Sequence, residues 1–127
     1  MATEAITRKR SYTAGTDLSA AQYHAVYLSG NKTVALCRGD VNYPIGILQN
    51  APTAGQAAEV VVGGVSPGVL GETVTAGARL QPSGTGTFVI VTPGHGYCAI
   101  AEEGGAAGAT VSIMFLQGAV IAAPLSP

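Results

Sequence analysis

Charged side chains are scarce in this chain. Lys, Arg, Asp and Glu make up 10% of its 127 residues, and hydrophobic residues make up 47%. A typical soluble domain carries about 25% charged residues. Intrinsic disorder is excluded, because it requires low hydrophobicity and high charge. Because so few residues are charged, part of the surface must be apolar. We expect a partner surface or an oligomer interface to cover this apolar part.

Long apolar runs and a secretion signal are also missing. Glycine or polar residues interrupt each apolar run well before the roughly 18–20 residues that a membrane-spanning helix needs, so we expect no membrane partner. Residues 1–10 lack an apolar signal core. Secretion is therefore not indicated, and reduced thiols inside a cell are expected.

Reactive and metal-binding groups are few and scattered. The two cysteines, Cys37 and Cys98, match no zinc or CxxC spacing and lie in apolar stretches, which predicts buried small hydrophobes. Only His24 and His95 could act as a base, and neither lies in a nucleophile motif. The acidic residues do not converge. We therefore expect no catalytic residue, no metal and no cofactor.

Glycine and proline, by contrast, are frequent, with 18 and 7 residues. They separate short β-rich segments, a pattern typical of a β-sandwich or β-barrel. The run 44–68 shows it best, with almost no charge. We predict about 7–10 strands and little helix. The segments expected to be strands are Tyr23–Leu28, Thr33–Cys37, Pro44–Leu48, Ala58–Gly63, Thr73–Thr75, Thr87–Thr92, Tyr97–Ala101 and Ala109–Leu116.

Three regions are expected along the chain: an extended N-terminal arm at 1–16, a β-barrel domain at 17–121 and an extended C-terminal tail at 122–127. The arm carries the basic cluster Arg8-Lys9-Arg10. This cluster is either a solvated tail or a docking segment for an acidic partner. Nucleic acid is a poor candidate partner, since no basic face follows and no aromatic residues interleave.

The order of segments resembles the capsid decoration, or cement, proteins of tailed bacteriophages. The resemblance covers about residues 23–116. The resemblance rests on five segments: the Tyr27-Leu28 strand with its hairpin, IGILQNAP at 45–52, GQAAEVVVGGV at 55–65, TAGARL at 75–80 and a closing hairpin at 99–116.

The resemblance implies an all-β fold, a small β-barrel or β-tulip-like sandwich, and a structural virion protein without enzymatic activity. Such a protein binds the outer surface of the icosahedral head as a homotrimer and stabilises contacts between major capsid proteins. It is assembled in the host cytoplasm. The candidate capsid-binding residues are Arg8, Lys9, Arg10 and Tyr12, in an arm that could add a strand to a capsid sheet. Deleting residues 1–12 is then expected to abolish binding and to preserve the fold.

The alternative is a ligand- or carbohydrate-binding β-barrel module of a virion fibre. Sugar sites usually present exposed Trp or Tyr platforms, and this chain has no Trp. A cluster of exposed tyrosines on one face would favour this alternative. The tyrosines concerned are Tyr12, Tyr23, Tyr27, Tyr43 and Tyr97.

Overall fold

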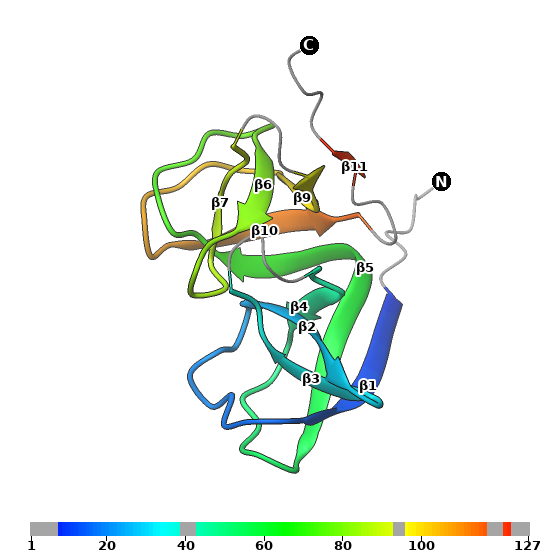
Figure 1. The fold of residues 1–127 in the computed structure, drawn as a ribbon. Helices are drawn as coiled ribbons and strands as arrows, with labels where there is room; N and C mark the ends of the chain where they lie inside the picture. The colour runs from blue at the N-terminus through cyan, green and yellow to red at the C-terminus, as the bar shows by residue number, and fades with distance from the viewer. Residues whose placement is uncertain (1–7, 39–42, 93–95, 117–120, 123–127) are drawn as a thin grey trace, which may run out of the picture.

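A computed structural model describes residues 8–38, 43–92, 96–116 and 121–122. In these residues the regular structure is all β, as predicted (Figure 1). The strands are β1 (Arg8–Ala14), β2 (Ala25–Gly30), β3 (Thr33–Leu36), β4 (Gly46–Leu48), β5 (Ala57–Val69), β6 (Arg79–Pro82), β7 (Phe88–Ile90), β8 (Gly96–Tyr97), β9 (Ala99–Ala101), β10 (Thr110–Phe115) and β11 (Ile121–Ala122).

The first half of the molecule is a closed five-stranded barrel. Its strand order is β1-β3-β2-β4-β5, and pairing between β1 and β5 closes the ring. β1 runs parallel to β3 at Thr13–Ala14, while the other neighbouring strands are antiparallel. The predicted hairpin between β2 and β3 is confirmed. Closure is favourable because it pairs strand edges that would otherwise stay open.

Strand β5 belongs to both halves of the molecule. Its first part pairs with β1 and β4, and its second part, from Gly64 to Val69, pairs with β10. Gly64 has a φ of 106°, a backbone conformation that residues other than glycine rarely adopt. The strand curves strongly as it passes from one half to the other (Figure 1). The strand predicted at Ala58–Gly63 therefore continues through this bend to Val69.

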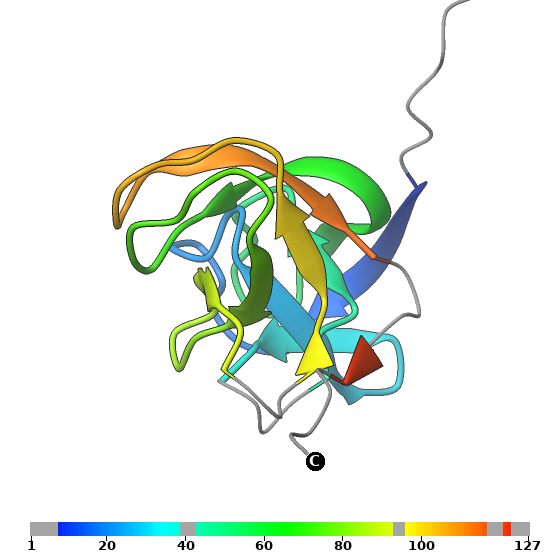
Figure 2. The ribbon, with the colours of Figure 1, turned by 90° about the horizontal axis from the view of Figure 1, so that it is seen from above.

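The second half is a rolled antiparallel sheet. Its order is β5-β10-β9-β6-β7. A bridge between Leu70 and Phe88 brings β7 back to the end of β5, and the Gly71 N–H donates to the Phe88 carbonyl at 2.8 Å. The view from above shows this sheet curling around its own interior (Figure 2).

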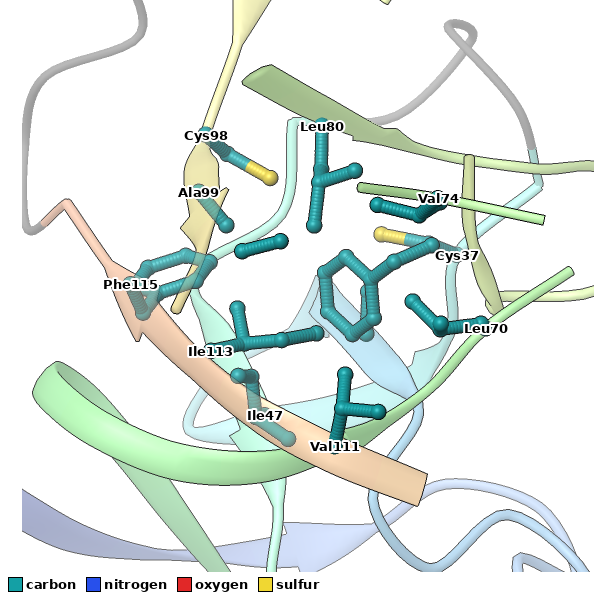
Figure 3. Packing of buried hydrophobic residues seen from close by; sticks show 13 residues of the cluster. Cys37, Ile47, Leu70, Val74, Leu80, Cys98, Ala99, Val111, Ile113 and Phe115 are labelled. Atoms are coloured by element: carbon teal, nitrogen blue, oxygen red, sulfur yellow. The ribbon is translucent and has the colours of Figure 1, made fainter. Parts of the chain in front are cut away.

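Two apolar cores lie on opposite faces of β2 and β4. Val26 and Leu48 belong to the core inside the barrel, whereas their neighbours Ala25 and Ile47 belong to the core of the second half. Because successive side chains of a strand point to opposite faces, both faces of these strands are buried. Figure 3 shows Ile47 meeting side chains from the second half, among them Ile113.

One turn recurs before three strands. In each copy a glycine with φ of 87° is followed by an N–H that donates to the carbonyl three residues earlier, as in a type II turn. The three turns are Thr53–Gln56 before β5, Thr75–Ala78 before β6 and Ala106–Ala109 before β10.

The expected N-terminal arm needs correction within the described residues. Residues 8–14 are strand β1 of the barrel, paired with β5 from Arg8 to Thr13. Tyr12 and Ala14 pack on the barrel core, which explains why this segment joins the sheet despite its charges. Residues 1–7 and 123–127 of the expected arm and tail lie outside the described residues.

One further strand was missed and one predicted strand was wrong. Strand β6 was not predicted, because its two buried side chains are Leu80 and Pro82, and proline within a short polar segment favours a turn. The expected strand at 73–75 is a single bridge between Val74 and Gly105.

Replacing Gly46 by Ala tests how tightly β4 fits against β5. An added Cβ would collide with the Val61 carbonyl and with Val60 Cγ1. We expect Gly46→Ala to lower the free energy of unfolding by about 1–3 kcal/mol, measured by urea denaturation. The control is Gly84→Ala, whose Cβ would meet nothing within 4 Å and which should stay within about 0.5 kcal/mol. Equal stability of the two variants would contradict the packing described.

Candidate functional site

The described residues offer no convergent catalytic or metal-binding set. No group of three or more His, Cys, Asp and Glu side chains among them could hold a metal ion. His24 and Asp17 line one hollow of about 380 Å³, but each has a local partner. His24 Nδ1 lies 3.0 Å from the Gln22 carbonyl oxygen, and hydrogen bonds from Ser19 lower the pKa of Asp17. His95 lies outside the described residues.

Both cysteines are buried in the core of the second half (Figure 3). Burial raises the pKa of the Cys37 thiol and of the Cys98 thiol to about 12. The thiolate is the nucleophilic form of cysteine, so these groups are chemically inert near neutral pH. Their prediction as small buried hydrophobes is confirmed.

The four candidate capsid-binding residues all lie on β1. Arg8, Lys9 and Arg10 are exposed, and Tyr12 is half-buried against the barrel core. The Arg10 guanidinium lies 5.9 Å from the centre of the Tyr12 ring, a cation–π contact along one face of the strand. Lys9 points to the opposite face. The barrel therefore holds this basic cluster at a fixed place.

One edge of β1 is only partly paired. The Ala14 N–H donates towards β5, to Gln56, whereas the Thr13 N–H donates the other way, to Lys32. By strand alternation the backbone groups of Lys9 and Ser11 face the same side as those of Thr13. Pairing with β3 on that side covers Thr13 and Ala14 alone among the described residues.

Positive charge gathers at this partly paired edge. Arg8, Lys9 and Arg10 lie on β1, and Lys32 follows at the tip of the β2–β3 hairpin, its carbonyl bonded to the Thr13 N–H. These are four of the six Lys and Arg residues of the chain. The exposed acid Glu59 lies across from Ser11 on β5. We name Arg8–Tyr12 with Lys32 the basic edge; its charge and open backbone groups suit an acidic, extended partner segment.

The tyrosines do not form an exposed cluster. Tyr43 is 76% exposed, whereas the other four are partly buried. Tyr12 and Tyr27 pack on the two cores, and Tyr97 lies beneath Arg79. The five tyrosines therefore do not form the exposed cluster that would favour a carbohydrate-binding module.

The fold is similar to a solved structure described as the N base of the head fiber gp8.5 of bacteriophage phi29. The likeness has a TM-score of 0.69 at 15% sequence identity and covers 87% of this chain and 94% of that one. At this identity it establishes a shared fold. No family model and no curated protein sequence matches the chain. None of the described residues lies in a helix that is long and apolar enough to cross a membrane.

Thiol labelling tests the buried cysteines. With a pKa of about 12, roughly one thiol in ten thousand is ionised at pH 8, and neither side chain is accessible. We expect a colorimetric disulfide reagent to react with two thiols in denaturant and with almost none in the native protein. Rapid labelling of the native protein would contradict this burial.

Proposed function

We propose that this chain is a structural protein of a phage virion that binds the outer surface of the head. The observation that carries the proposal is the fold shared with the phi29 head fiber base over 87% of this chain. Since a fold alone does not determine function, the residues must support it separately. The basic edge and the scarcity of reactive groups both fit a binding role without catalysis.

The proposed partner is the major capsid protein. An extended acidic segment of a capsid subunit would pair with the open side of β1, gaining backbone hydrogen bonds at Lys9 and Ser11. Arg8, Lys9, Arg10 and Lys32 would add charge complementarity, which speeds association and fixes register. A homotrimer on the shell would multiply these contacts, so that modest single contacts give persistent binding. Bound in this way, the protein would stabilise contacts between neighbouring capsid subunits.

A role as the base of a fibre is the second candidate. The name of the structural neighbour favours it, because that protein is the base of a head fiber. Head binding is common to both roles. They separate when the heads are stressed: a cement protein raises their resistance to heat, whereas a fibre base leaves it unchanged.

Co-sedimentation with expanded, undecorated heads of the cognate phage tests head binding. We expect saturable binding at a fixed ratio to the major capsid protein, and release of the genome at a higher temperature for decorated heads. Free protein left in the supernatant at every concentration would overturn the proposal, and binding to immobilised glycans instead would support a ligand-binding module.

Removing two charges from the basic edge tests its role. We expect Lys9→Ala/Arg10→Ala to weaken head binding by at least about tenfold and to reduce its dependence on salt. The matched control, Thr75→Glu/Ala107→Glu, changes the net charge by the same amount at two exposed turn positions of the second half. Equal loss in both variants would show that net charge, and not this edge, governs binding.

Substitution is a sharper test here than truncation. Deleting residues 1–12 removes Arg8–Tyr12 of β1, the part that pairs with β5 and closes the barrel. The expectation that such a deletion preserves the fold is therefore withdrawn.

A further inference from the structure

The outer face of the second half carries an apolar row. Along β10, Val111, Ile113 and Phe115 face the core, so Met114 faces outward. The strand register continues this row across the sheet. Its members, in order from β5 to β6, are Val65, Met114, Ile100 and Arg79. Met114 is 37% exposed at the centre of the row, and Val65 and Ile100 are half-buried.

One end of the row is positively charged. The exposed Arg79 has its guanidinium 5.3 Å from the centre of the Tyr97 ring. This contact orients the guanidinium on an aromatic surface and leaves its outer side available to an acidic group.

The other end of the row is a hollow with an acidic rim. It measures about 360 Å³, and Val65, Pro67 and Glu103 are among its lining residues. The Ser112 N–H donates to Glu103 Oε2 at 2.8 Å, and the Ser112 hydroxyl donates to Glu102 Oε1 at 2.8 Å. The bond to Ser112 holds the Glu103 carboxylate at the rim beside Val65 and Pro67, an arrangement that suits a cation with an apolar flank.

We propose that a second copy of this chain docks here, head to tail. Arg79 and Tyr97 of one copy enter the hollow beside Glu103 of the next, and Met114 and Ile100 are covered between them. The two ends of the row carry opposite charges, Arg79 at one and Glu103 at the other, which favours this contact. The inference rests on the proposed function for its setting, a cluster of copies on a shell, and it names the surfaces that join them.

The roll of the sheet favours a head-to-tail contact over a two-fold one. Three steps separate β5 from β6 in the order β5-β10-β9-β6, and the sheet curls until β7 meets Leu70. The outer sides of β5 and β6 therefore face different directions (Figure 2). One copy thus contacts two neighbours, one with each end of the row. Such heterologous contacts form a ring when the rotation from one copy to the next divides a full turn.

Charge reversal at the two ends tests the contact. Sedimentation equilibrium of the full chain over a range of concentrations gives the self-association constant. We expect a ring for the wild-type chain and at least about tenfold weaker association for Arg79→Glu and for Glu103→Arg. The double variant, Arg79→Glu/Glu103→Arg, should associate as well as the wild type, because the reversed charges match again.

Two controls keep the test decisive. Ala20→Glu/Ala54→Glu makes the same change in net charge as Arg79→Glu at two exposed positions of the first half and should leave self-association unchanged. Glu103→Gln retains an acceptor for the Ser112 N–H, so a weaker association in this variant reports the lost charge and not a disturbed loop. Thermal unfolding of each variant checks that the fold is retained.

The outcomes separate this inference from the proposed function. A wild-type chain that is monomeric at every concentration, or a double variant that stays as weak as the single ones, overturns the head-to-tail contact. If Arg79→Glu also impairs head binding of a monomeric chain, the row belongs to the capsid contact instead. Chains that associate as predicted but ignore heads leave the contact standing and contradict the proposed function.

Discussion

The pairing of β5 with both halves is the constraint on which the rest of the structure depends. Its 13 residues close the barrel against β1 and, beyond the bend at Gly64, carry the second sheet through β10. Because β5 is continuous, the two halves share one backbone and face each other across β2 and β4. A break in this strand would separate the two cores and open the barrel. Strand β1 would then lose its fixed position.

This arrangement gives the basic edge its functional interest. Flexible basic tails lose conformational entropy when they bind, whereas a strand held in a barrel has already lost it. Arg10 is further restrained by its contact with Tyr12. Preorganisation of this kind suits the proposed binding to a shell, in which many copies of the protein each make modest contacts. The charges also keep the open edge from pairing with unrelated strands, a common role of lysine on edge strands.

Much of the fold could be predicted from local patterns. The strands predicted at 23–28 and 109–116 overlap β2 and β10, because β-rich segments and the turn residues between them are local signals. The strand β1 could not be predicted, since Arg8-Lys9-Arg10 looks polar and only Tyr12 and Ala14 reach the core. Strand β6 is four residues long, buries only Leu80 and Pro82, and depends on β9 and β7 for its pairing. Such strands are determined by distant partners, which the local sequence does not identify.

The same limit applies to the candidate sites. The basic cluster was visible in the sequence, but its place on a closed barrel, beside Lys32, depends on the β1–β3 pairing. The row from Val65 to Arg79 was not visible at all, because its four residues come from four strands and meet only through the register. The predicted burial of Cys37 and Cys98, by contrast, followed directly from their apolar neighbours.

A cryo-electron microscopy reconstruction of expanded heads saturated with this protein tests the central claim most directly. The account predicts density for the barrel on the outer surface of the shell, with β1 facing the capsid and its open edge beside an extended capsid segment. A reconstruction with no added density, or with β1 turned towards solvent, would contradict it.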